Sequence, residues 1–402
     1  MAVPSQPELL GSASTDDAPR LSTGSSEFDR VLGGGLVAGS VTLIGGDPGI
    51  GKSTLLLQSA AALAGAVSVV YATGEESVRQ VGLRARRLGL GQAPLALMAD
   101  TGVESIIGAA QSAGARVLVV DSIQTMASNE VEASAGSVTQ LRESAARFVA
   151  FAKRSGTAVV LIGHVTKEGV IAGPRVLEHL VDAVLYFESD AGSRFRVVRA
   201  IKNRFGAANE IGVFAMDEQG LREVKNPSAI FLSRHDTPVP GSVVTVTREG
   251  TRPMLIEVQA LVDDSRAQVP RRVAVGVDGN RLSLLLAVLH RHGGVALGGH
   301  DVFINIVGGV RVEETAADLA LLVTAVSSLE NRALPQDLVV FGELGLAGEI
   351  RPVPFGEERL REAQKHGFTR AIVPRANAPR KSIEGLHVTA VTRLDEALAA
   401  AR

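Results

Sequence analysis

Short apolar runs alternate with longer helical patterns along the chain from about residue 21 onward. The short runs predict buried strands at 41–44, 67–73, 95–98, 117–121, 158–163, 183–188 and 195–202. Helical patterns follow Ser53, Glu76, Gly102 and Val138. This alternation indicates an α/β domain with a mostly parallel sheet and helices on both faces. Strand follows strand near 183–214, so we expect one antiparallel edge there.

A second unit is predicted after residues 226–228, where Asn-Pro-Ser interrupts the alternation. Strands or apolar runs are expected at 241–247, 255–261, 302–305, 337–342 and 370–374, and helices at 281–290, 316–329 and 357–366. This order of elements is typical of an α+β domain. We therefore predict a polar, flexible tail at 1–20, an α/β domain at 21–226 and an α+β domain at 227–402.

Composition narrows the class of protein. Hydrophobic residues make up 46% of the 402 positions, which indicates a globular chain, and the formal net charge is only −2, so any nucleic-acid site must be local. The absence of cysteine excludes disulfides and a cysteine zinc site. Neither a signal-peptide pattern nor an apolar stretch of 18 residues is present, so we expect a cytoplasmic protein with no membrane partner.

The octapeptide Gly-Asp-Pro-Gly-Ile-Gly-Lys-Ser at 46–53 follows a predicted strand and precedes a predicted helix. In that context the pattern predicts a loop whose backbone N–H groups surround the phosphates of a nucleoside triphosphate. Lys52 would reach the β- and γ-phosphate oxygens, and the Ser53 hydroxyl would bind Mg²⁺. The predicted ATP-binding residues are Gly46, Asp47, Pro48, Gly49, Ile50, Gly51, Lys52, Ser53 and Thr54.

Two further strands end in acidic residues. Asp121 follows four apolar β-formers and would hold the Mg²⁺ side of the site, although a strand-ending aspartate can also simply cap a helix. Glu75, in Ala-Thr-Gly-Glu-Glu-Ser, is predicted as the catalytic base that activates water, with Glu76 assisting or structural.

A basic cluster, Lys202-Asn203-Arg204-Phe205-Gly206, ends another predicted strand. Such a pair of cations is usually a solvated surface. Here the glycine that follows allows both side chains to project from a fixed corner. We predict that Lys202 and Arg204 act catalytically by entering a neighbouring subunit's site, as an arginine finger does.

Taken in order, the segments at 21–54, 71–77, 117–125 and 202–206 closely resemble those of the bacterial RadA (Sms) family of branched-DNA repair ATPases, and the resemblance covers 21–402. It implies a RecA-like motor domain joined to a domain like that of Lon protease. It also implies hexameric rings that hydrolyse ATP on single-stranded and branched DNA and promote branch migration of recombination intermediates. In the family, binding to a RecA-type recombinase commonly involves an amino-terminal zinc module.

The resemblance also assigns residues. His164 occupies the position of a γ-phosphate sensor, and 127–139 and 165–179 would face the ring pore, with Lys167 and Arg175 contacting DNA phosphates. Without the family context, His164 is more often a packing or capping residue, and the loop cations are ordinary solvated charges.

Protease chemistry can be tested in the second domain, where 342–353 resembles the core of Lon's proteolytic domain. The nucleophile's position falls at Ala316 and the base's position at Arg359, and neither residue can do that chemistry. An ATP-dependent protease is therefore disfavoured, while an ATP-switched ring scaffold stays open as an alternative to the motor. Arg271, Arg272 and Arg311 are weaker candidates for a DNA-binding surface. The family's usual amino-terminal four-cysteine zinc module cannot form in a chain without cysteine.

Overall fold

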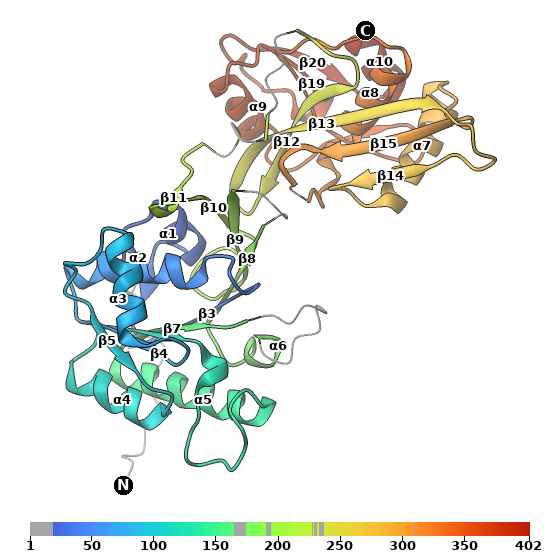
Figure 1. The fold of residues 1–402 in the computed structure, drawn as a ribbon. Coiled ribbons are helices and arrows are strands. Elements are labelled where there is room, and N and C mark those ends of the chain that lie inside the picture. Colours follow the sequence, from blue (N-terminus) through green and yellow to red (C-terminus); the bar gives the residue numbers. More distant parts are fainter. Residues whose placement is uncertain are drawn as a thin grey trace, which may run out of the picture. The chain divides into compact units, whose positions relative to one another are not determined.

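The computed structural model describes residues 19–164, 174–189, 194–226, 228, 231–232, 237–309 and 311–402. The chain divides into two compact units, Met1–Val224 and Lys225–Arg402, which are treated separately below (Figure 1). No helix in the described ranges is both long and apolar enough to cross a bilayer.

The first unit is built on a nine-stranded sheet with the order β11-β10-β9-β8-β3-β7-β6-β4-β5. Six of these strands run parallel, and β9 to β11 complete one edge in antiparallel fashion, which confirms the predicted arrangement. The strands are β3 (Val41–Gly46), β4 (Val69–Thr73), β5 (Ala96–Ala99), β6 (Val117–Asp121), β7 (Ala158–Ile162), β8 (Ala183–Glu188), β9 (Phe195–Asn203), β10 (Ile211–Asp217) and β11 (Gly220–Glu223). A separate two-stranded pair, β1 (Arg20–Leu21) and β2 (Leu36–Val37), precedes them.

Helices bury both faces of this sheet, because alternate strand residues point to opposite sides. Val117 and Val119 of β6 belong to one core and Leu118 and Val120 to the other. The first core is completed mainly by α1 (Ser26–Leu32) and α2 (Lys52–Ala64), with a smaller contribution from α3 (Val78–Arg87). The second is completed by α4 (Val103–Ser112), α5 (Val138–Ser155) and α6 (Pro174–Leu177).

The second unit holds a mixed seven-stranded sheet with the order β14-β15-β13-β12-β16-β19-β20. Its strands are β12 (Ser242–Glu249), β13 (Arg252–Asp264), β14 (Arg272–Val275), β15 (His300–Ile306), β16 (Leu338–Val340), β19 (Arg370–Pro374) and β20 (His387–Val391). A small pair, β17 (Glu343–Leu344) with β18 (Ile350–Arg351), lies outside it. The helices are α7 (Gly279–Gly293), α8 (Asp318–Leu329), α9 (Gly356–Lys365) and α10 (Leu394–Ala401).

The strand directions of the first unit determine where its chemistry lies. Strands β3, β4, β6 and β7 are parallel neighbours, so their carboxyl ends meet at one edge of the sheet. The segments that follow these four strands begin at Asp47, Gly74, Ser122 and Gly163. In open α/β sheets, ligands bind at this edge.

Candidate functional site

The loop between β3 and α2 has the backbone geometry of a phosphate-binding loop. Gly46, Gly49 and Gly51 have φ values of 151°, 77° and 122°, which side chains other than glycine rarely adopt. A Cβ atom on Gly46 would also lie 2.8 Å from the Cβ of Phe187. Helix α2 begins without a side-chain cap and without an acidic residue in its first turn. Its first N–H groups and the positive end of its dipole are therefore suited to a phosphate.

Lys52 begins α2 and is turned back into the loop. Its Nζ donates hydrogen bonds to the carbonyl oxygens of Gly46 at 2.7 Å and Asp47 at 2.8 Å, and the residue is only 3% exposed. Burial lowers the pKa of Lys52 from 10.5 to about 8, against the opposing effect of nearby carboxylates, of which Asp121 is the strongest. Phosphate oxygens would offer the same ammonium a charged and therefore stronger acceptor.

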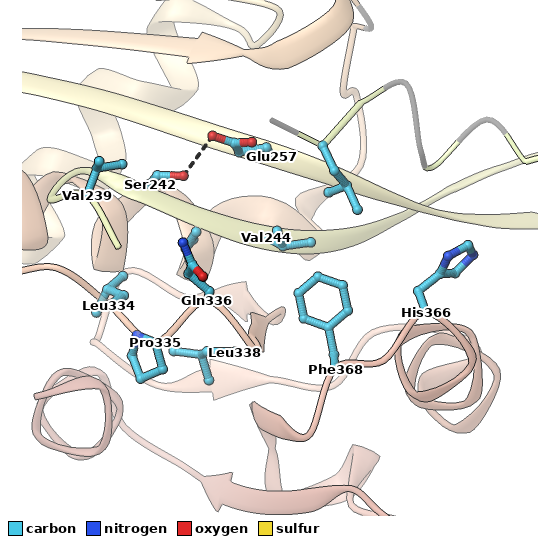
Figure 2. Close-up of a pocket in the computed structure, with 12 residues that line it drawn as sticks. Val239, Ser242, Val244, Glu257, Leu334, Pro335, Gln336, Leu338, His366 and Phe368 are labelled. Atoms are coloured by element: carbon cyan, nitrogen blue, oxygen red, sulfur yellow. Dashed lines mark hydrogen bonds between the residues drawn. The ribbon is translucent and has the colours of Figure 1, made fainter. Parts of the chain in front are cut away.

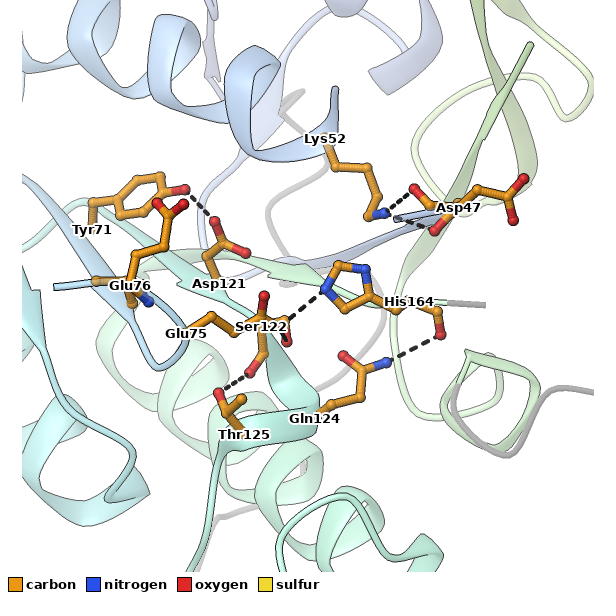
Figure 3. Close-up of polar contacts among 12 residues, drawn as sticks. Asp47, Lys52, Tyr71, Glu75, Glu76, Asp121, Ser122, Gln124, Thr125 and His164 are labelled. Carbon is orange, nitrogen blue, oxygen red and sulfur yellow. Dashed lines mark hydrogen bonds and ion pairs between the residues drawn. The ribbon is translucent and has the colours of Figure 1, made fainter. Parts of the chain in front are cut away.

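Asp121 ends β6 beside Thr73 of β4, and it is 6% exposed. The buried hydroxyl of Tyr71 donates a hydrogen bond of 2.6 Å to its Oδ2 atom (Figure 3). Burial and the Asp121 carboxylate together raise the pKa of Tyr71 well above its usual value, so this hydroxyl keeps its proton and stays a donor. Tyr71 thus orients one oxygen of Asp121.

The residues present fit Mg²⁺ rather than a metal held wholly by protein. The described part of the chain contains no group of three or more histidine, cysteine or carboxylate side chains that could enclose a metal. Mg²⁺ does not require one, because it usually binds one or two protein oxygens together with phosphates and water. The Ser53 hydroxyl and the Asp121 carboxylate are the oxygens that would hold it.

Glu75 lies at the centre of a polar group that joins the ends of three strands, β4, β6 and β7. Its Oε1 accepts a short hydrogen bond from the Ser122 hydroxyl and lies 3.0 Å from the Nε2 of His164. The Gln124 side chain in turn donates a 3.2 Å hydrogen bond to the carbonyl oxygen of His164 (Figure 3). The structure therefore brings Glu75 and His164 together, as their predicted roles at one phosphate require.

Glu76 is held differently from its neighbour. Its carboxylate pairs with the Arg84 guanidinium, and its backbone N–H bonds to the Thr73 hydroxyl at 3.0 Å. These contacts assign Glu76 to the start of α3 and leave Glu75 as the acid that faces the loop. Sequence reasoning missed Tyr71, Ser122 and Gln124, although each lies next to or within a segment that was singled out.

The basic cluster at 202–206 lies near the amino ends of the parallel strands, on the side of the sheet opposite their carboxyl ends. Lys202 pairs with Val184 near the start of β8, whereas the phosphate-binding loop follows Gly46, which pairs with Phe187 near the end of β8. At about 3.3 Å per residue, the separation along the strand is roughly 10 Å or more. These cations cannot serve the phosphate loop of their own unit.

The two cations also differ from each other. The ammonium of Lys202 donates to the carbonyl oxygens of Glu178 at 2.7 Å and Val181 at 2.9 Å, and burial lowers its pKa. Lys202 therefore does not project freely as expected, because two backbone carbonyl oxygens of its own unit bind its ammonium. The Arg204 guanidinium contacts Asp182 at 3.0 Å while its side chain remains 55% exposed.

Comparison of the sequence with known proteins shows the family to which the chain belongs. Residues 12–170 match the sequence family described as AAA domain, and residues 285–377 match the one described as Subunit ChlI of Mg-chelatase. The DNA repair protein RadA of Pseudomonas aeruginosa is 61% identical over 391 residues, covering 97% of this chain and 86% of the relative. The RadA proteins of Escherichia coli and Bacillus subtilis are 59% and 48% identical and cover 97% and 98% of this chain, and 85% and 86% of their own length. The chain belongs to the RadA family of DNA repair proteins. The predicted fold class, a P-loop ATPase core followed by a Lon-like α+β domain, is confirmed.

The Lon-like domain of this RadA family member has no peptidase chemistry at the two predicted positions. Ala316 is buried, and Arg359 is 1% exposed. The Arg359 guanidinium forms two 2.7 Å contacts with the carboxylate of Glu314 and donates to the carbonyl oxygen of Val246 at 2.6 Å. An arginine held in this way cannot act as a base, because its guanidinium does not lose a proton in proteins.

The candidate DNA-binding cations are not gathered into one patch. Arg271 and Arg272 lie at the start of β14, which runs parallel to β15, whereas Arg311 comes after the end of β15. The Arg272 guanidinium donates to backbone carbonyls, including that of Leu297 at 2.8 Å, while Arg311 is 73% exposed. The Arg272 guanidinium is thus bound to carbonyl oxygens of its own unit, whereas Arg311 is the more exposed cation.

The two predicted pore segments are described to different extents. Lys167 lies outside the described residues, and Arg175 belongs to α6 with its side chain outside them. Segment 127–139 is described and contains Glu130 and Glu132 but no lysine or arginine. We therefore expect little phosphate attraction from that segment itself.

The second unit also contains a cavity of about 340 Å³ (Figure 2). Apolar side chains such as Val244, Leu338 and Phe368 form much of its wall. Its buried carboxylate, Glu257, accepts a 2.8 Å hydrogen bond from the Ser242 hydroxyl. The described residues that line it include no lysine or arginine, so it does not suit a triphosphate.

Proposed function

We propose that this DNA repair ATPase is a DNA-dependent motor that binds single-stranded and branched DNA and promotes branch migration of recombination intermediates. It works in the cytoplasm as a homo-hexamer and engages a RecA-type recombinase. The observation that carries the motor proposal is the position of Arg204, at the sheet edge opposite the phosphate-binding loop. Each copy then supplies a loop to one site and an arginine to the next.

In the proposed site, Lys52 and the N–H groups of α2 bind the phosphates of ATP. Ser53 and Asp121 would hold Mg²⁺, whose positive charge would offset that of the phosphates. Glu75 accepts the proton of the attacking water, since its carboxylate is partly exposed and lies at the same edge. His164 contacts Glu75 and directly precedes the predicted DNA-contacting segment, so it can report the state of the γ-phosphate to that segment.

ATP turnover with and without single-stranded DNA tests the motor. We expect Glu75→Gln to bind ATP but to lose at least about 100-fold in kcat, in line with the loss of a general base. Glu76→Gln is the matched control, because Glu76 is an adjacent acid that pairs with Arg84 instead of facing the loop. Normal turnover in Glu75→Gln would refute the assignment of Glu75 as the base. ATP turnover that single-stranded DNA leaves unchanged would instead favour an ATP-switched DNA-binding scaffold.

Mixing variants tests the shared site. Lys52→Ala lacks a working loop, and Arg204→Ala lacks the cation that reaches the neighbour. Each variant alone should be inactive, whereas a mixture should regain activity wherever an intact loop meets an intact arginine. Full activity of Arg204→Ala on its own would refute the shared site.

A further inference from the structure

A buried carboxylate that the sequence reasoning did not single out holds the exposed arginine of the basic cluster. Asp182 directly precedes β8, and its side chain is 3% exposed. Its Oδ1 accepts a hydrogen bond from the Arg204 guanidinium at 3.0 Å, and the Lys153 ammonium lies 3.1 Å from both oxygens. One buried carboxylate therefore binds two half-exposed cations.

The backbone around Asp182 makes this contact rigid. The N–H of Asp182 donates to the carbonyl oxygen of Val41 at 2.9 Å, and the N–H of Val41 donates to the Oδ2 of Asp182 at 3.0 Å. The N–H of Arg204 donates to the carbonyl oxygen of Asp182 at 3.1 Å. Arg204 is thus fixed at its backbone and at its guanidinium to a residue that is itself fixed to β3.

The geometry leaves part of the guanidinium available. Within the described ranges, Arg204 contacts Asp182 through one terminal nitrogen, and its side chain is 55% exposed. Arginine presents five N–H donors in a planar fork, so its remaining donors can meet phosphate oxygens while Asp182 keeps its orientation. Lys202, by contrast, is bound to two carbonyls and does not compete for this position.

We propose that Asp182 is the positioning residue for Arg204, which it holds in the orientation that reaches the triphosphate bound by a second copy of this chain. The inference rests on the proposed shared site and adds to it the group that determines where its arginine points. A displacement of about 1 Å in such a group can reduce the rate about 100-fold. A carboxylate that acts only by joining β3 to α5 would have no such effect on catalysis.

The test uses a double variant that keeps the charge of the cluster unchanged. Asp182→Asn with Lys153→Met removes one negative and one positive charge, and asparagine retains an oxygen that can accept from Val41. Lys153→Met alone is the reference, because Arg204 keeps its carboxylate there. The measurements are kcat and KM for ATP in the presence of single-stranded DNA, for each full-length variant and for mixtures with Lys52→Ala.

We expect kcat of the double variant to fall between about 10-fold and 100-fold below that of the Lys153→Met reference, with KM for ATP within about threefold. Mixing the double variant with Lys52→Ala should restore activity, because its intact loop then meets the correctly held Arg204 of the other copy. Mixing it with Arg204→Ala should restore nothing, since both lack a positioned arginine.

Two outcomes would overturn the positioning role of Asp182 and leave the shared site standing. The first is a kcat of the double variant within twofold of the reference while Arg204→Ala is inactive. The second is a loss of kcat that mixing with Lys52→Ala does not restore, as a folding defect would give. Full activity of Arg204→Ala would overturn the shared site and the role of Asp182 together. These results separate a failure of the positioning role from a failure of the proposed function.

Discussion

Lys52 gives the sharpest physical prediction, because its ammonium is buried and, among the described residues, hydrogen-bonds to backbone carbonyls and to no carboxylate. Its pKa of about 8, against an ordinary value of 10.5, means that the unfolded chain holds this proton more tightly than the folded chain. Between these two pH values the unfolded state binds more protons, so the stability contributed by this group rises with pH. Below pH 8 both states are protonated, and the folded state bears the full penalty of about 3 kcal/mol.

The perturbation is Lys52→Met, which removes the titration and retains an apolar side chain of similar length. From the two pKa values, the parent should gain about 1 kcal/mol from this group between pH 7 and pH 9. Other groups titrate equally in both proteins. The free energy of unfolding of Lys52→Met minus that of the parent should therefore fall by about 1 kcal/mol over that interval, because only the parent gains stability from this group.

Tyrosine fluorescence isolates the relevant transition in urea unfolding without nucleotide. The chain has no tryptophan, and its two tyrosines, Tyr71 and Tyr186, both belong to the first unit. Matched protein concentrations at both pH values keep any association constant. A difference between the two proteins that stays the same or widens from pH 7 to pH 9 would refute the claim that burial destabilises this ammonium.

Three further substitutions probe other parts of the structure. Tyr71→Phe removes the buried donor of Asp121, so it should destabilise the first unit by about 1–3 kcal/mol in chemical denaturation. It should also weaken Mg²⁺-dependent ATP binding, and unchanged binding would contradict this role of Tyr71. Arg359→Met should lower the hydrogen-exchange protection of β12 amides by up to about 3 kcal/mol, because the Glu314 carboxylate loses the guanidinium that pairs with it. Equal protection in variant and parent would argue against a structural role of this pair. Gly206→Ala should reduce ATP turnover while leaving nucleotide binding intact, because its Cβ would lie 2.7 Å from the backbone that follows α1; full turnover would show that this corner tolerates movement.

Much of the fold could be predicted from the sequence, because the buried strands of a parallel sheet are nearly continuous apolar runs. The carboxyl-edge positions of Asp121 and Glu75 followed from the same runs. The 67–73 strand was predicted two residues too early, and β4 begins at Val69. Apolar pattern does not resolve such boundaries, since Val67 also packs partly against the core.

The positions that escaped prediction depend on contacts between distant segments. In the sequence, Asp182 is simply an acidic residue before a predicted strand. The pairing of β8 with β3 and β9 brings it into contact with Lys153 and Arg204. Likewise, nothing in the cluster at 202–206 indicates that one cation turns inward, because the carbonyls that bind Lys202 lie more than 20 residues away in the chain. Local pattern identifies which residues carry charge, whereas tertiary contacts decide what each charge meets.

The opposite placement of loop and arginine along β3 also sets a counting rule for assembly. If every complete site needs a loop from one copy and Arg204 from the next, an open row of n copies contains n − 1 complete sites. A closed ring of the same n copies contains n. Closure thus adds one working site, and a gap in the ring removes the site at that gap alone. Catalytic capacity would then report directly on whether the ring is open or closed around DNA.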